Sequence, residues 1–226
     1  IGEWDSHGIG PHDISLMPDG MTLVIANGGI QTHPDSGRAK LNIPDMKPNL
    51  VFLDVRNGSL ISKVTLPSEL HKNSIRHLDA GHDGTVLFGM QYQGNSSDSP
   101  PLVGMIRRDG KSLLFDAPET LAPELRGYCA DVAIDPSGRF GASTFPRGNR
   151  IAIWSLPDGK LVSVNSVRDS ADIAAGPHPG DFQFSTGFGK ILSHSAKPSA
   201  PIAASRTQRF AGLAFDNHMT PLERPL

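Results

Sequence analysis

The stretch from residue 131 to residue 164, DVAIDPSGRFGASTFPRGNRIAIWSLPDGKLVSV, decides how the rest of the chain is interpreted. It holds four short apolar segments, and the first and third connections between them are the glycine turns Asp135-Pro-Ser-Gly138 and Asp158-Gly159. Glycine readily adopts the positive φ that tight turns between antiparallel strands require. The stretch therefore predicts four consecutive strands arranged as two hairpins.

The same arrangement recurs along the chain. Turn glycines that separate two strand-like segments stand at Gly20, Gly84, Gly138 and Gly180, and second turns stand at Asn57-Gly58, Asp109-Gly110 and Asp158-Gly159. Units of four strands that recur every few tens of residues are typical of β-propeller blades. A β-sandwich also has strands at such intervals, but it does not explain a repeated pair of hairpins. We predict an all-β propeller domain over 1–226, with blade-like repeats at 10–66, 75–116, 128–166 and 170–220.

The two ends of the chain suggest that this propeller is partial. The segment Phe210-Ala-Gly-Leu-Ala-Phe215 resembles one more inner strand, and Ile1-Gly-Glu-Trp4 resembles the outer strand of an earlier blade. We therefore expect about four C-terminal blades of a larger ring, preceded by blades that are missing from this chain.

Composition narrows the class of protein. The 226 residues carry a formal net charge of −2 and form no basic stripe, which argues against nucleic-acid binding. No apolar run approaches the roughly 18 residues of a membrane helix, and no signal peptide is visible. Because Cys129 is the only cysteine, no intrachain disulfide can form. Its apolar neighbours predict a buried core residue instead of a reactive thiol.

Propeller topology predicts where a binding site would lie. The innermost strand of each blade starts at the face where the second strand ends, so polar residues at these positions converge around the central axis. Loops on a rigid scaffold are common ligand sites, and the long polar segment 27–48 is a further candidate. The candidate ligand-binding residues are His12, Asp13, Asn27, His33, Arg76, His77, Gln91, Asp131 and Arg147.

Three kinds of chemistry are open to these residues. His12 and His77 are candidate metal ligands, with Asp13, Asp131 or His33 completing a shell suited to zinc, iron or copper. The alternative is that such side chains only tie strands together, and Asp13, Asp131 and Asp172 are candidates for backbone bonds that lock neighbouring blades. Arg76, Arg147 and Arg38 are candidates for clamping an anionic ligand, since guanidinium matches carboxylate and phosphate.

Four segments together resemble one protein family: Gly8-Ile-Gly-Pro-His-Asp13, residues 24–38, Ser74-Ile-Arg-His-Leu78 and Pro146-Arg-Gly-Asn149. They are similar to a family of exported bacterial proteins that carries the domain-of-unknown-function number fifteen-thirteen. The resemblance implies a seven-bladed, quinoprotein-like propeller with YVTN/WD40-like repeats. It also implies a twin-arginine export signal, a periplasmic location and genes beside iron-uptake components. This chain would then lack the signal and about three blades.

Three functions remain, and the third is a pure interaction scaffold whose blade edges and long loops contact proteins. The first is a non-catalytic propeller that binds a small ligand, a metal or a partner protein, with a link to iron uptake. The alternative is a propeller enzyme, either a metal-dependent lactonase-like hydrolase or a quinoprotein-like oxidoreductase, and neither its cofactor nor its reaction can be read from the residues. No Gly-x-Ser-x-Gly elbow, phosphate-binding glycine loop or cysteine-based metal motif is present. We therefore expect a binding function.

Overall fold

The computed structural model describes residues 3–196, 207–216, 218 and 219. These residues form four antiparallel sheets, and each sheet holds four strands in chain order. The first is β1 (Pro11–Leu16), β2 (Thr22–Asn27), β3 (Asn49–Asp54) and β4 (Leu60–Thr65). The second is β5 (Asn73–Ala80), β6 (Val86–Tyr92), β7 (Val103–Ile106) and β8 (Ser112–Phe115). The third is β9 (Asp131–Ile134), β10 (Phe140–Phe145), β11 (Arg150–Ser155) and β12 (Lys160–Ser166). The fourth is β13 (Ser170–Ala175), β14 (Asp181–Thr186), β15 (Lys190–Ser195) and β16 (Thr207–Arg209).

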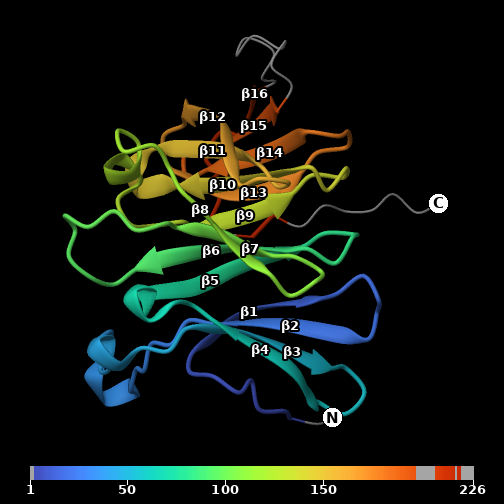
Figure 1. Cartoon of the computed structure of the whole chain (residues 1–226). Helices are drawn as coiled ribbons and strands as arrows, with labels where there is room; N and C mark the ends of the chain where they lie inside the picture. Colours follow the sequence, from blue (N-terminus) through green and yellow to red (C-terminus); the bar gives the residue numbers. More distant parts are fainter. Residues whose placement is uncertain (1–2, 197–206, 217, 220–226) are drawn as a thin grey trace.

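The four sheets follow one another through the molecule as propeller blades do (Figure 1). Their first strands β1, β5, β9 and β13 are the inner strands, and each contacts the next in that order. The all-β, four-stranded blade architecture predicted from the turn glycines is therefore confirmed. The seven-bladed ring stays a prediction, because the described residues form four consecutive blades.

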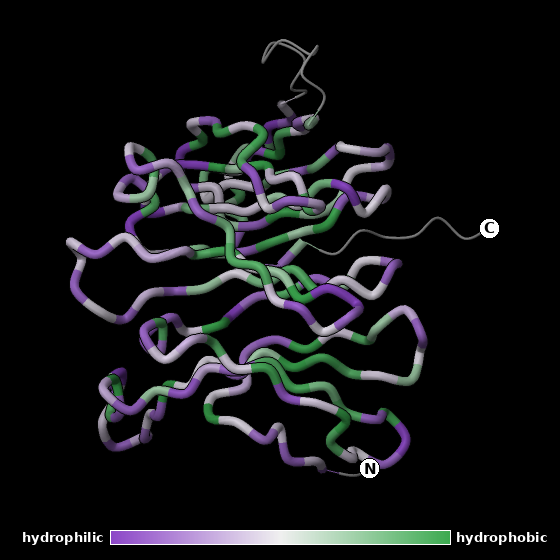
Figure 2. Tube along the Cα trace, viewed as in Figure 1, coloured by the Kyte–Doolittle hydropathy of each residue, from purple (hydrophilic) through white to green (hydrophobic). Residues whose placement is uncertain are grey.

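The core lies between neighbouring blades. Figure 2 shows hydrophobic residues along the strands and hydrophilic ones at the turns. The rings of Phe115 from the second blade and Trp154 from the third have centroids 5.5 Å apart, and Trp154 donates from Nε1 to Ser143 Oγ at 2.8 Å. Cys129 is fully buried in the same cluster, and burial raises the pKa of its thiol. Its predicted place in the core is thus confirmed.

The inner strands are also tied to one another by carboxylates. Asp13 Oδ2 accepts the backbone N–H of Leu78 at 3.0 Å, and Asp131 Oδ2 accepts that of Ile173 at 3.2 Å. Asp79, which the repeat comparison overlooked, accepts from Ile134 at 2.7 Å. Each bond joins one blade to the next, so it secures the angle between the two blades.

The tail differs from the expectation of a further inner strand. Residues 210–215 form a turn in which Gly212 has a φ of 76°, and the Phe210 and Phe215 rings meet at 5.6 Å. Phe210 donates its N–H to Gly189 O, so the tail folds back onto the fourth blade. At the other end, Glu3 and Trp4 are not in a strand, while Ile1 and Gly2 lie outside the described residues. Within the described part of the chain, no helix has the length and apolarity to cross a membrane.

Candidate functional site

Two of the predicted residues lie at irregularities of the inner strands. The pairing register of β1 shifts at His12, and that of β5 shifts at Arg76. A β-bulge leaves one residue out of the ladder and redirects its side chain, and bulges are frequent beside functional sites. Here the two side chains meet, with Arg76 Nη1 2.9 Å from His12 Nδ1. Because guanidinium can only donate, Nδ1 of His12 is the acceptor.

His77 is the most unusual side chain of the molecule. It is 1% exposed, yet neither ring nitrogen has a hydrogen-bond partner among the described residues. Burial, with smaller contributions from His12, His218 and Arg76, lowers the pKa of His77 to about 3, so its ring is neutral. A buried polar group without a partner typically costs a protein about 1–3 kcal/mol. Such a group in a native structure calls for an explanation.

Comparison of the blades shows that His77 stands at a repeat position that is aspartate in two other blades. In three blades, the residue seven positions before the turn glycine lies near the start of the inner strand. It is Asp13 before Gly20, His77 before Gly84 and Asp131 before Gly138. The two aspartates bond to the next blade, whereas His77 does not, and Asp79 makes the tie in its place. The second blade therefore keeps its structural bond and frees His77 for another role.

Three potential ligands surround the His77 ring. Nδ1 of His77 lies 3.8 Å from Oδ1 of Asp131, which is too far for a hydrogen bond. The ring of His218 lies at a centroid distance of 5.1 Å, and the ring of His12 stands perpendicular to His77 at 5.1 Å. One ligand atom from each of His77, Asp131 and His218 lies within 4.8 Å of the other two. We call His12, His77, Asp131 and His218 the axial cluster.

The carboxyl group of Asp172 lies beside Asp131 of the axial cluster. Asp131 is 7% exposed and Asp172 is 3% exposed, and their carboxyl groups are hydrogen-bonded to each other. Burial, followed by that bond and the charge of Asp172, raises the pKa of Asp131 well above its usual range. The acidic pair therefore holds a proton beside the neutral imidazole of His77, and a cation bound there would displace that proton and take Asp131 as a carboxylate ligand.

On the other side of His12, three cationic side chains gather. Nζ of Lys40 bonds to Oε1 of Gln93, and the guanidinium of Arg147 stacks on the Tyr128 ring at 4.1 Å. Burial and the charges of Arg76 and Arg147 lower the pKa of Lys40. We call Lys40, Arg76 and Arg147 the cationic cluster.

The remaining predicted residues have structural or separate positions. Asn27 is fully buried and donates from Nδ2 to Asn49 Oδ1 and to Ser6 O. Gln91 pairs through its backbone with Tyr128. His33 caps the short 3-10 helix η1 (Pro34–Ser36) and accepts from Asp35 N, and it is exposed like Arg38. No contact joins His33 or Arg38 to the axial cluster within the described ranges.

Sequence reasoning missed one member of each cluster, His218 and Lys40, and it also missed Tyr128, which stacks on Arg147. His218 follows the turn at 210–215, beyond the described strands of the fourth blade, and only the folded tail brings it to the His77 ring. Lys40 lies in the long loop between β2 and β3 that was singled out as a candidate, while Tyr128 lies in the connection between β8 and β9. The one signal for Lys40 in the sequence was its place among the charged residues of that long loop.

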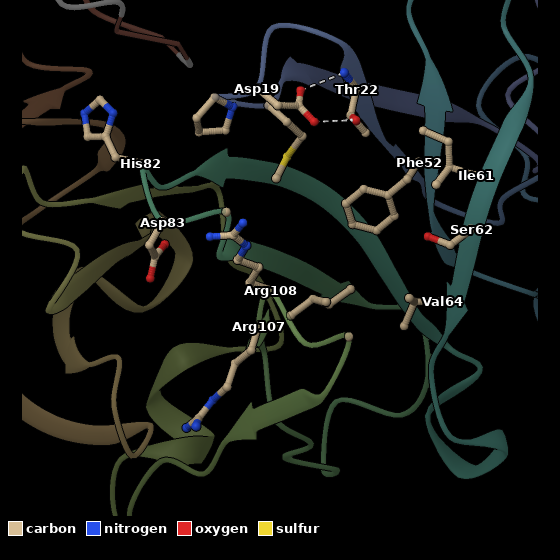
Figure 3. A pocket seen from close by; sticks show the side chains of 15 residues that line it. Asp19, Thr22, Phe52, Ile61, Ser62, Val64, His82, Asp83, Arg107 and Arg108 are labelled. Carbon is tan, nitrogen blue, oxygen red and sulfur yellow. Dashed lines mark hydrogen bonds between the residues drawn. The ribbon is translucent and has the colours of Figure 1, made fainter.

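A separate groove lies away from both clusters. A cavity of about 470 Å³ opens between the first and second blades, at the turn ends of the inner strands, as Figure 3 shows. Phe52, Ile61 and Val64 form its apolar wall, and Asp19 bonds to Thr22 at its rim. No residue of the axial or the cationic cluster lines it.

The family described as "Protein of unknown function (DUF1513)" has a model that matches residues 1–222. The chain therefore belongs to this family, as its four motif segments indicated. No curated protein matches the sequence at a significant level.

Solved structures support the fold. The structure titled "Structure of U3-55K" aligns with a TM-score of 0.65 and 12% identity over 94% of this chain and 55% of that one. "Kuenenia stuttgartiensis Hydrazine Synthase" aligns with a TM-score of 0.60 and 15% identity over 89% of this chain and 59% of that one. A functionally unknown protein from Desulfotomaculum acetoxidans DSM 771 aligns with a TM-score of 0.53 and 15% identity, over 82% and 51%. The chain spans only about half to three-fifths of these proteins, and at such identities the likeness concerns the fold alone.

Proposed function

We propose that this member of the DUF1513 family is a metal-binding propeller, with a divalent transition-metal ion held by His77, Asp131 and His218. The observation that carries the proposal is His77, which is buried and has both ring nitrogens unpartnered beside a carboxylate and a second imidazole. An ion would give one of the ring nitrogens the partner that no described neighbour supplies.

The distances support this assignment. Two ligand atoms that each lie about 2.0–2.2 Å from one ion stand roughly 3–4 Å apart. The 3.8 Å between His77 Nδ1 and Asp131 Oδ1 already falls in that range. His218 is exposed and follows an irregular tail, so it is the ligand best able to move inward. Two imidazoles with a carboxylate suit zinc, iron or copper.

We further propose that the protein is exported to the periplasm and serves iron handling. This part rests on the family resemblance of the motif segments. Iron(II) fits the imidazole and carboxylate ligands of the axial cluster as well as zinc does.

The test is metal analysis of the untagged protein with a titration of Zn²⁺ and Fe²⁺ into metal-stripped samples. His218→Ala is the main variant, because His218 is exposed and its loss leaves the core intact. We expect close to one ion per wild-type chain and at least tenfold weaker binding in the variant. His82→Ala is the matched control, since His82 is an exposed histidine at the far groove.

Three results would overturn the proposal. They are a wild-type chain that binds neither ion, a His218→Ala variant that binds as the wild type does, and a His82→Ala variant that weakens binding equally. His77→Leu adds a second check, because it removes the central ligand while it fills the buried space.

A further inference from the structure

The cationic cluster is unusual because its charges are unbalanced. Each of Lys40, Arg76 and Arg147 is more than 4.0 Å from every carboxylate of the described residues, whereas Arg56 and Arg150 each pair with an acid. Within the described residues, the side-chain hydrogen bonds of Lys40 and Arg76 go to neutral groups, namely Gln93 and His12. Arg147 stacks on a neutral ring. Three uncompensated cations repel one another unless an anion joins them.

Arg76 provides an independent sign of a missing partner. Its Nε atom is buried and has no acceptor among the described residues, although its Nη1 is bonded. The side chain is half-buried, while Lys40 and Arg147 are exposed to solvent. An incoming ligand can therefore reach the cluster from outside and meet an arginine that is already positioned by the β5 bulge.

We infer that Lys40, Arg76 and Arg147 form a binding site for a small multivalent oxyanion, a polycarboxylate or a phosphate. Arginine presents planar, two-pronged donors that match both groups, and lysine adds a point charge. The Tyr128 ring orients the Arg147 guanidinium, so less side-chain entropy is lost when an anion binds.

Because the cationic cluster adjoins the axial cluster, an anion bound there affects the binding of a metal ion. His12 contacts Arg76 on one side and the His77 ring on the other, so the two clusters adjoin. Three nearby positive charges disfavour a bare divalent cation, whereas an anion bound between them neutralises that repulsion. The anion site itself does not depend on the metal proposal, and it is tested without metal.

The experiment is calorimetric titration of the metal-stripped full chain with citrate and, separately, with inorganic phosphate at about 0.15 M ionic strength, where long-range charge effects are screened. We expect saturable binding of at least one of the two anions. Arg147→Gln and Arg76→Gln should each weaken it at least tenfold. Arg108→Gln is the control, because Arg108 is an exposed arginine at the far groove.

The two anions separate the ligand classes. Tighter binding of citrate supports a polycarboxylate, and tighter binding of phosphate supports a phosphate ligand. The inference is overturned if the wild type binds neither anion, or if Arg147→Gln and Arg108→Gln have the same effect. Arg147 is exposed, so its variant reports on binding even if Arg76→Gln folds poorly.

Discussion

The two ends of the inner strands treat buried polar groups in opposite ways. At the turn end of β9, Asp135 is 2% exposed and accepts five hydrogen bonds, from Ser137 N and Oγ and from the N–H groups of Arg139, Phe140 and Gly180. At the axial end of β5, His77 is 1% exposed and accepts none. Asp135 and His77 are thus buried to a similar degree, but Asp135 is hydrogen-bonded and His77 has no partner among the described residues.

The difference indicates that the turn end of the inner strands fixes the arrangement of the blades, whereas the axial end is free to bind a ligand. Bonds to Asp135 close the β9–β10 turn and reach the fourth blade through Gly180, so that carboxylate organises two blades. Although burial would raise the pKa of Asp135, the hydrogen bonds from Ser137, Phe140 and Gly180 hold it below its usual value. The hydrogen bonds at the turn end stabilise the charged form of Asp135, whereas the buried His77 at the axial end has no hydrogen-bond partner among the described residues.

The largest effect is expected from Asp135→Ala. Its removal leaves buried N–H groups unpaired, and each such group typically costs about 1–3 kcal/mol, so we expect a loss of about 3 kcal/mol in the free energy of unfolding. Urea denaturation monitored by the fluorescence of Trp154 measures it. Metal content should not change. A loss below about 1 kcal/mol would contradict the view that this end carries the architecture.

The next effect concerns the blade that contains His77. Asp79→Ala should lower the free energy of unfolding by about 2 kcal/mol, because it frees the N–H groups of Ile134 and Ala80. Asp13→Ala should cost about half as much, because the second bond of Asp13, from the N–H of Ile14, is exposed. No measurable loss from Asp79→Ala would show that Asp79 does not replace His77 as the tie of the second blade.

Much of the fold was readable from the sequence, because turns are local. Gly20, Gly84, Gly138 and Gly180 take positive φ at the predicted hairpins. The tail was misread because apolar alternation in Phe210–Phe215 looks the same whether the segment pairs or turns. In the site, His12, Arg76, His77 and Asp131 were predicted, since they head repeated strands.

The other members of the site follow from tertiary structure alone. His218 reaches the axis through a non-repetitive tail, and Lys40 through a long loop, so no periodicity marks either residue. Asn27 stays a predicted binding residue: its Nδ2 donates to Asn49 and Ser6, while its buried Oδ1 has no partner among the described residues. Whether a polar side chain is satisfied depends on neighbours that are distant in the chain.

A smaller effect of opposite sign is expected from His77→Leu in the metal-stripped protein. Leucine fills the space without leaving polar atoms unpaired, so the free energy of unfolding should rise by about 1 kcal/mol while metal binding is lost. Thermal unfolding of the stripped variant and wild type measures the difference. A loss of more than about 1 kcal/mol would instead show that the ring of His77 is a structural part of the core.

The smallest effect comes from a histidine that does have a partner. Asn165 Nδ2 donates to His194 Nε2 at 2.9 Å, and burial lowers the pKa of His194. Because the unfolded chain takes up this proton more readily, the stability that His194 contributes is lost as the pH falls from about 6.5 towards the lowered pKa. His194→Gln keeps an acceptor for Asn165 and removes the titration. Since the ring is half-exposed and screened by water, the variant should resist acid by only about 0.5 kcal/mol relative to wild type at pH 5. Urea midpoints at pH 5 and pH 8 measure this, and an unchanged pH dependence would show that a satisfied imidazole titrates as it does in the unfolded chain.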